Sequence, residues 1–359
     1  KPVWEQIKQK LGLCSPPEQE GLVQQDQVLR LSTYDIRSFL ECPLQGSARF
    51  LLRLDEDEDE ILLKESELFE PSGRANSMLL RNVFLEKLSR EHQENKPFEF
   101  KDFYDTHARY FELEGLLPTG PFLRAARERH LKLLERWQEN LPLLGAGRSP
   151  PMEVRRFGRP VEQDYVDVAN PPLSMDMVVG PNKDRIRVEI SGRTEVFIPE
   201  WPATIIPHPA DNARRISPKF FMRGFLDQVF LSAVGEHETK PWTVLVNPAE
   251  EALRYKHKHC IRQFKPLDAQ TSRDYLRNVV EDMLTQVHAY YMPVEVVFEH
   301  ITGEESVAQI AERKQRSPWD VTSSDHGPVH DPNRYQAPED AQKIIAKRYG
   351  LYFEQLKGR

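Results

Sequence analysis

The spacing of apolar residues changes near the middle of the chain, and this change constrains the fold more than any other feature. Residues 74–143 repeat apolar side chains at helical spacing, as in SMLLRNVFLEKL and FLRAARERHLKLLERWQENL. Past Gly145, alternating or β-branched runs bounded by proline and glycine predict strands, as in PPLSMDMVVG and RIRVEISGRTEVFI. The segments SPKFFMRGFLDQVFLSAVGE and DAQTSRDYLRNVVEDMLTQVHAYYM return to helical spacing, and the first is expected to begin with Ser217 as N-cap and Pro218 at the first helical position. This order predicts an α/β core that carries a helical insertion near the N-terminus.

The length of the chain and the polar character of its first residues indicate one elaborated domain with extensions. A chain of 359 residues exceeds the roughly 250–300 residues at which one hydrophobic core stops growing. The first thirty residues carry two adjacent prolines and a glutamine-rich run, which is typical of an arm or linker. We therefore expect four parts: an N-terminal arm or linker at 1–30, a helical part at 31–150, an α/β core at 151–300, and a C-terminal loop and helix at 301–359.

Several classes of protein are disfavoured by features that the sequence lacks. No run approaches the roughly 18–20 apolar residues of a membrane-spanning helix, and the first residues lack the order of a signal peptide, so we expect a cytoplasmic protein without a membrane partner. The three cysteines are widely spaced, which argues against a disulfide framework, a zinc site or an iron–sulfur cluster. Neither a GxSxG motif nor a Walker loop occurs. A net charge of −7 argues against a uniformly basic coat for nucleic acid, but it permits a local basic groove.

The stretch LSTYDIRSFLECPLQGSARFLLRL, residues 31–54, predicts two short helices separated by a Cys-Pro break. Ser32 or Thr33 can accept hydrogen bonds from the free amides of a helix start, and Asp35 suits the positive end of the helix dipole. Pro43 ends or bends this first helix. The apolar side chains that share one helix face are Ile36, Phe39 and Leu40.

This stretch resembles the N-terminal helix-CP-helix motif of the RecB-family PD-(D/E)XK nucleases, and more narrowly the C-terminal domain of RecC and AddB-type subunits. Further matching segments are GLLPTG, ISGRTEVFI, RGFLDQVFLSAVGE and FKPLDAQTSRDYLRNVVEDMLTQVHAYYMPVEVV, so the resemblance spans about residues 31–300. The resemblance implies a PD-(D/E)XK nuclease-like mixed sheet flanked by helices. For the last of these segments it implies a helix followed by a proline-led apolar strand.

The resemblance also locates the expected active site, and the residues found there are incomplete. A PD-(D/E)XK site needs one acid at the end of a strand, then an acid and a lysine two residues apart on the next strand, so that carboxylates hold Mg²⁺. The resemblance places the first acid at Glu195, in GRTE, and the following strand at ATIIPH. That strand ends in Pro207 and His208, without the acid and the lysine, and Asn76 replaces the upstream histidine of the family. Glu195 is therefore expected to be either a solvated strand residue or a vestigial ligand, with no catalytic residue, bound metal or other cofactor.

A basic segment is the candidate contact for DNA. RYKHKHCIRQFK interleaves positively charged side chains with the rings of Tyr255 and Phe264. Lysine and arginine neutralise phosphates, and exposed rings stack on unpaired bases, so this combination suits single strands. The predicted DNA-binding residues are Arg254, Lys256, Lys258, Arg262, Lys265 and Phe264.

The resemblance implies a non-catalytic nuclease-like scaffold and DNA-strand-guiding domain in a RecBCD- or AddAB-like helicase–nuclease, similar to the gamma subunit of exodeoxyribonuclease V. Such complexes process double-strand breaks for homologous recombination. The implied partners are DNA, single-stranded or at ends, a RecB- or AddA-like helicase–nuclease subunit, and, as a further candidate, a RecD-like subunit. Two alternatives stay open. One is an active Mg²⁺-dependent exonuclease that combines Glu195 with Glu189, Asp211 or Asp227, and the other is an interaction module unrelated to DNA.

Overall fold

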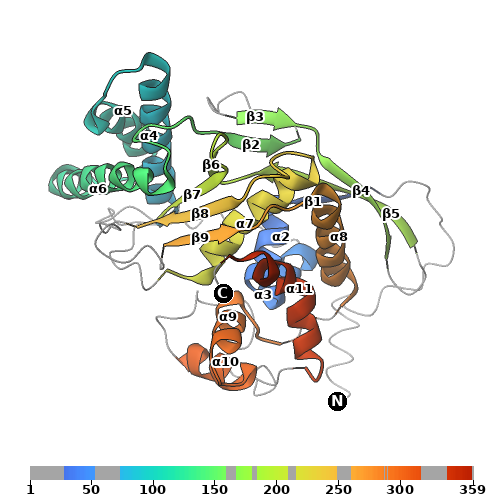
Figure 1. Cartoon of the computed structure of the whole chain (residues 1–359). Helices are drawn as coiled ribbons and strands as arrows, with labels where there is room; N and C mark the ends of the chain where they lie inside the picture. Colours follow the sequence, from blue (N-terminus) through green and yellow to red (C-terminus); the bar gives the residue numbers. More distant parts are fainter. Residues whose placement is uncertain are drawn as a thin grey trace.

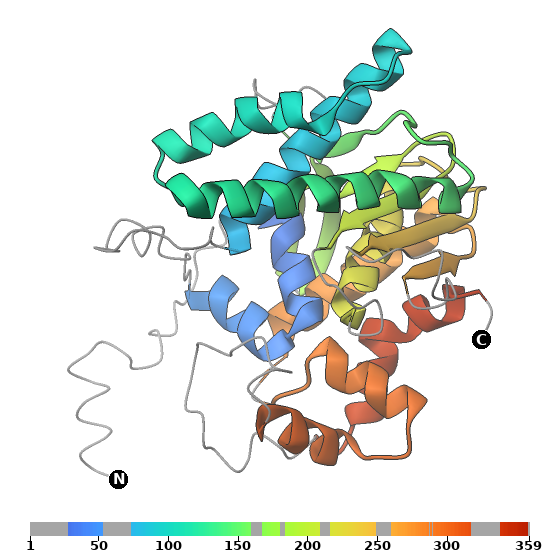
Figure 2. The same ribbon diagram turned by 90° about the vertical axis from the view of Figure 1, so that its left-hand side faces the viewer.

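The chain folds as a mixed α/β structure in which two mixed sheets are flanked by helices (Figure 1). The helices of residues 73–140 and those of residues 294–316 lie at opposite ends of the molecule in both views (Figures 1 and 2). Every helix in the described part of the chain is too short or too polar to cross a membrane. The computed structural model describes residues 28–52, 73–158, 167–179, 184–208, 216–248, 260–286, 288, 290–316 and 338–357.

The first sheet is organised around its longest strand, β5. This strand pairs in parallel with β1 and antiparallel with β4, and its end pairs antiparallel with β2, which carries β3 in parallel. In β4 the side chains alternate between buried and exposed, as the sequence pattern predicts for a strand with one face on the core. Because β1 begins at Val28, the last three residues of the predicted arm belong to the sheet. The strands are β1 (Val28–Ser32), β2 (Val154–Phe157), β3 (Asp167–Asn170), β4 (Leu173–Val179) and β5 (Asp184–Arg193).

The second sheet has four strands in the order β6-β7-β8-β9. Strands β7 and β8 are parallel, and the helix α7 connects them. Helix α7 begins with Ser217 as N-cap and Pro218 at its first position, which confirms both predictions, and it is buried along most of its length. The elements are β6 (Val196–Ile198), β7 (Ala203–Pro207), α7 (Pro218–Ala233), β8 (Trp242–Asn247) and β9 (Ile261–Phe264).

The helical insertion forms a layer of its own beside the second sheet. It consists of α4 (Gly73–Glu94), α5 (Phe100–Leu113) and α6 (Gly120–Asn140), followed by the 3₁₀ turn η2 (Leu141–Leu144). The buried side chains of these helices make a second core, which also takes in apolar residues of β6 and β7. Polar contacts also tie α6 to the second sheet: Asn140 Nδ2 donates to Asn247 Oδ1 over 2.9 Å, and Asn247 Nδ2 donates to the Trp137 carbonyl over 2.8 Å. Trp137 Nε1 donates to the His208 carbonyl over 3.4 Å.

The helices that close the other side of the molecule correct one expectation. Residues 294–297 were expected to form a proline-led strand, but they begin a helix whose N-cap is Pro293. A short run of valines suits a buried strand and a buried helix equally, and here the buried valines belong to the core that α7 shares. These closing helices are α8 (Ala269–Thr285), α9 (Val294–Thr302), α10 (Val307–Arg316) and α11 (Ala341–Gln355).

The predicted helix-CP-helix stretch forms α2 (Thr33–Glu41) and α3 (Pro43–Leu52). Ser32 is the N-cap of α2: its hydroxyl accepts from the Asp35 amide, and the Asp35 carboxylate accepts from the Ser32 amide. The two helices cross at very short range, because a Cβ atom built at Gly46 would lie only 2.5 Å from the Cα of Phe39. Glycine at this position therefore sets the approach of α3 to α2.

Replacing Gly46 with alanine should lower the free energy of unfolding by about 1–3 kcal/mol, because the added methyl group meets backbone that cannot move aside locally. Urea unfolding followed by circular dichroism measures the loss. Gly350, also in a helix, is the matched control, since a Cβ atom there meets only a side-chain oxygen at 3.9 Å. Gly350→Ala should be neutral or stabilising by up to about 1 kcal/mol. Equal effects of the two substitutions would contradict the close crossing.

Candidate functional site

The sequence-predicted candidate Glu195 lies in the short connection between β5 and β6, and its side chain is only 16 % exposed. Two arginines from other parts of the chain hold it. Arg37 Nη1 of α2 lies 3.3 Å from Glu195 Oε1, and Arg81 Nη1 of α4 lies 3.4 Å from Glu195 Oε2. Each carboxylate oxygen of Glu195 therefore faces a guanidinium group.

A second carboxylate lies directly against Glu195. Asp227 of α7 is fully buried, and both of its carboxylate oxygens accept from the Glu195 amide at 3.2 Å. Arg37 Nη2 donates to Asp227 Oδ1 over 2.6 Å, and Thr204 of β7 donates to Oδ2 over 3.1 Å. Trp242 Nε1 donates in turn to the Thr204 hydroxyl. The guanidinium of Arg37 thus bridges the two carboxylates.

Burial and the neighbouring charges shift the pKa values of the two carboxyl groups in opposite directions. Burial raises the pKa of Asp227 to about 7, although the charge of Arg37 opposes the shift. Burial would raise the pKa of Glu195 as well, but the positive charges of Arg37 and Arg81 hold it below its ordinary range. Glu195 is therefore ionised at neutral pH, whereas Asp227 exchanges its proton near neutrality.

A third ion pair extends the site to the C-terminal end of α2. Arg223 of α7 binds Glu41 with both ends of its guanidinium fork, Nε to Oε1 and Nη2 to Oε2, the latter over 2.9 Å. The charge of Glu195 also acts on Arg223. We refer to this set of six side chains as the arginine–carboxylate cluster: Arg37, Arg81, Arg223, Glu41, Glu195 and Asp227.

The residues of the cluster do not fit a Mg²⁺ site. Mg²⁺ requires several oxygen ligands in a near-octahedral shell, but here the carboxylate oxygens are directed at guanidinium and amide donors. The next strand, β7, ends at Pro207, and the ring of the following His208 packs on Phe220 with 4.6 Å between ring centroids. Within the described residues, no group of three or more acidic, histidine or cysteine side chains is placed to hold a metal ion.

The partners considered for Glu195 from sequence have different outcomes. Asp227 does lie against Glu195, but in a helix and joined to it by Arg37. Glu189 lies on β5 and forms an ion pair with Arg30 of β1, at 3.6 Å. Asp211 lies outside the described residues.

The predicted DNA-binding segment is described only at its end. Arg254, Lys256 and Lys258 lie outside the described residues. Arg262 places its guanidinium 4.7 Å from the centroid of the Phe221 ring, and Lys265 Nζ donates to the carbonyl of Glu354.

The expectation that the Phe264 ring is exposed for stacking on a base is wrong. Phe264 is fully buried, with its ring packed against Phe225 of α7 and Tyr352 of α11. It is the last residue of β9, and α7 and α11 cover its side chain. Phe264 is therefore a residue of the hydrophobic core.

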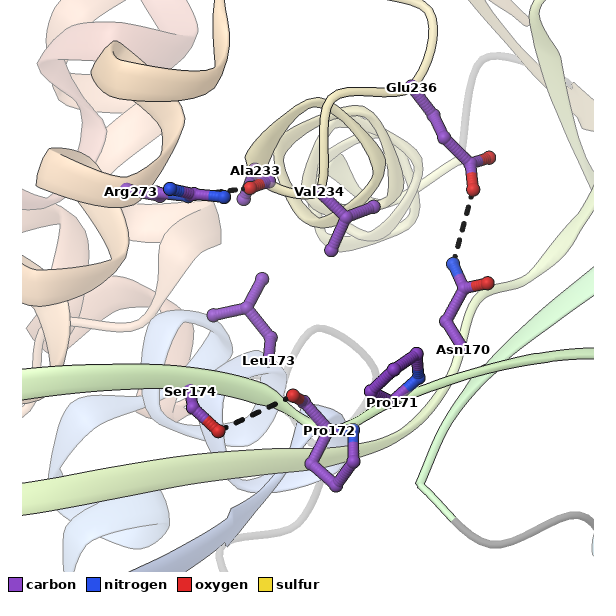
Figure 3. Close-up of a pocket in the computed structure, with 9 residues that line it drawn as sticks. All are labelled: Asn170, Pro171, Pro172, Leu173, Ser174, Ala233, Val234, Glu236 and Arg273. Atoms are coloured by element: carbon purple, nitrogen blue, oxygen red, sulfur yellow. Dashed lines mark hydrogen bonds between the residues drawn. The ribbon is translucent and has the colours of Figure 1, made fainter.

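A pocket of about 380 Å³ opens elsewhere, between the turn that joins β3 to β4, the end of α7 and the start of α8 (Figure 3). Its polar groups are engaged with one another. Arg273 Nε donates to the Ala233 carbonyl, and Asn170 Nδ2 donates to Glu236 (Figure 3). The Ser174 hydroxyl faces the Pro172 carbonyl at 3.5 Å, not a base that would activate it. The lining therefore lacks a catalytic set, and the arginine–carboxylate cluster remains the stronger candidate site.

Comparison of the chain with known protein families and with curated proteins gave no match.

Proposed function

We propose that this protein is a non-catalytic domain of the PD-(D/E)XK type that serves as a scaffold and DNA-strand guide in a RecBCD- or AddAB-like helicase–nuclease. It would act in the cytoplasm in the repair of double-strand breaks by homologous recombination. The observation that carries the proposal is the bridge made by Arg37, whose two terminal nitrogens contact Glu195 and Asp227. A nuclease of this type holds a divalent cation between its carboxylates, and here a guanidinium holds them instead.

The arrangement of the second sheet supports the same proposal. Strands β6 and β7 pair antiparallel, and α7 then leads to β8, which is parallel to β7. Glu195 stands immediately before this unit, and Asp227 lies on its helix. This order is compatible with a nuclease-like core whose metal ligands are lost, because no acid-x-Lys triplet follows β7 in the sequence up to α7.

The energetics of the cluster weigh against the alternative of an active Mg²⁺-dependent exonuclease. A metal ion at Glu195 and Asp227 would displace Arg37 and Arg81, and Asp227 is fully buried. Breaking a buried ion pair costs about 3–5 kcal/mol, because it leaves charged groups without compensation. The free energy of metal binding would have to exceed the cost of displacing two arginines, at a site that offers few oxygen ligands.

The direct test is a cleavage assay. End-labelled single- and double-stranded linear DNA is incubated with the full chain in Mg²⁺ or in Mn²⁺, and Glu195→Ala serves as the matched variant. We expect no metal-dependent cleavage by either protein. Cleavage that requires the metal and disappears in Glu195→Ala would overturn the proposal in favour of a rearranged nuclease site.

Two further measurements test the roles as guide and scaffold. The affinity for single-stranded DNA should fall with rising salt, with a slope of log K against log salt near −0.7 for each phosphate neutralised. Co-purification with a RecB- or AddA-like subunit, with or without a RecD-like subunit, tests the scaffold role separately. Loss of either property would remove that half of the proposal.

A further inference from the structure

An exposed tyrosine ring stands at the outer end of the arginine–carboxylate cluster. Tyr34, the second residue of α2, is 53 % exposed, and Arg49 of α3 donates to its hydroxyl over 3.0 Å. Arg223 interacts electrostatically with both Tyr34 and Glu195. Tyr34 therefore lies at the surface beside the cluster, whose most exposed members are Arg223 at 31 % and Arg81 at 21 %.

The helical period of α2 explains why Tyr34, Arg37 and Glu41 lie on one side of the helix. Thr33, Ile36, Phe39 and Leu40 are buried on the inner face of the helix. Positions 34, 37 and 41 lie three and four residues apart and so form an adjacent face, on which Tyr34 is exposed and Arg37 turns inward to Asp227. The same helix therefore anchors the motif in the core and presents Tyr34, Arg37 and Glu41 in a row.

The arginine–carboxylate cluster together with Arg49 contains more guanidinium groups than carboxylates, in a chain whose net charge is −7. Even with every carboxyl group ionised, the guanidinium groups outnumber the carboxylates, and partial protonation of Asp227 near neutrality increases the excess. A local positive region on a negative protein attracts an anionic polymer to that place and disfavours contact elsewhere. The guanidinium groups are those of Arg37, Arg49, Arg81 and Arg223, and the carboxylates are those of Glu41, Glu195 and Asp227.

Two arginine nitrogens in this region are donors that lack an acceptor among the described residues. Arg37 Nε and Arg81 Nη2 are buried and have no hydrogen-bond partner among the described residues. A buried donor without an acceptor costs about 1–3 kcal/mol. The side chain of Arg81 is 21 % exposed, so it connects the inner cluster with the surface.

We propose that Tyr34 and the arginines beside it form a subsite for single-stranded DNA, in which an unpaired base stacks on the Tyr34 ring and Arg49 and Arg81 neutralise the neighbouring phosphates. Stacking on an exposed ring requires a base whose face is free, which favours a single strand over a duplex. The inference rests on the proposed function, since it names the place at which the guided strand is held. It does not depend on the basic segment that ends at Lys265.

The test measures the binding of fluorescein-labelled oligo-dT of about 20 nucleotides to the full chain by fluorescence anisotropy at low salt. Removal of one stacking ring costs about 1–3 kcal/mol per base, so Tyr34→Ala should raise Kd by about fivefold or more. Tyr34→Phe keeps the ring and should stay within about twofold of the wild type. Tyr110, which is 64 % exposed on α5, supplies the matched control, and Tyr110→Ala should leave Kd unchanged.

A second variant tests the phosphate contact without removing the ring. Arg49→Gln should weaken binding and make the salt slope shallower by about 0.7, the contribution of one phosphate on a single strand. Thermal unfolding of every variant shows whether the fold is retained; Tyr34 is exposed and Arg49 is half-buried.

The outcomes separate this inference from the proposed function. If the wild type binds oligo-dT and Tyr34→Ala binds as tightly as Tyr110→Ala, the subsite is wrong, and the strand is guided elsewhere on the protein. If the wild type does not bind oligo-dT even at low salt, the strand-guiding half of the proposed function fails, and the subsite fails with it.

Discussion

Replacing Arg37 with alanine should lower the free energy of unfolding by about 3–5 kcal/mol at about pH 8. Arg37 is the ion-pair partner of Asp227, which is fully buried, and it also contacts Glu195. Without it, the donors that Asp227 keeps among the described residues are neutral ones, the Glu195 amide and the Thr204 hydroxyl. Urea unfolding at fixed pH measures the loss.

The same substitution should cost less at about pH 5.5, because Asp227 can then take up a proton. In the wild type the pKa of Asp227 rises from an ordinary value of 3.8 to about 7 on folding. The folded state therefore binds this proton more readily, and the contribution of Asp227 to stability falls as pH rises from about 4 to about 7. Glu195 acts in the opposite sense, because folding lowers its pKa. Its contribution to stability is present above its ordinary pKa of 4.5 and is lost as pH falls through the pKa of the folded state.

Asp227→Asn in the Arg37→Ala background is the control for this interpretation. It removes the uncompensated charge and should restore a large part of the lost stability, so the two substitutions should be strongly non-additive. A loss that is independent of pH, or that Asp227→Asn does not reduce, would show that Arg37 stabilises the protein through packing and not by compensating Asp227.

Replacing Arg348 with alanine should have an effect of similar size, about 3–5 kcal/mol, at the other side of the core. Arg348 of α11 is 1 % exposed, and its Nε lies 2.6 Å from Asp282 Oδ2 of α8. Its Nη2 lies 2.9 Å from His288 Nδ1, and its guanidinium packs on the Phe39 ring of α2. One side chain therefore connects α11 to α8 and to the helix-CP-helix motif, and its loss would leave Asp282 buried with only a distant cation.

Lys347 is the matched control, because it is the adjacent residue and interacts with the same region. Its side chain is 36 % exposed, and its Nζ lies 3.6 Å from Glu281 and 3.9 Å from Asp282. Exposed pairs of this kind contribute about 0–1 kcal/mol, so Lys347→Ala should change urea unfolding little. Comparable losses in the two variants would contradict the central position given to Arg348.

The order of helices and strands was predictable because it depends on local periodicity and on capping residues. Ser32 and Ser217 begin the helices for which they were proposed, and Pro43 separates α2 from α3. The error at residues 294–297 arose where a short apolar run carries no period that distinguishes a strand from a helix. The error at Phe264 arose because burial depends on which elements cover a strand, and α7 and α11 come from distant parts of the chain.

The candidate site was predictable only in part. Glu195 and Asp227 were both named from sequence, but Arg37 and Arg81, which decide the chemistry of the site, were not. The separation along the chain explains this: Arg37 lies 158 residues from Glu195, and Arg81 lies 114 residues from it. The local signal was one face of α2, where Tyr34, Arg37 and Glu41 recur at helical spacing, but a helix face does not reveal which carboxylates it will meet.

The pairing of the second sheet with short segments outside it determines how other chains can associate with it. At one margin, Glu153 exchanges backbone hydrogen bonds with Phe197 of β6. At the other, Leu356 forms a bridge with Phe264 of β9, and the Lys357 amide donates to the Gln263 carbonyl. Unpaired edge strands allow strand addition and aggregation, and these contacts block both by pairing the edge strands β6 and β9. A partner subunit that extended this sheet beyond β9 would first have to displace residues 355–357, so side chains and helix surfaces offer the easier route to assembly.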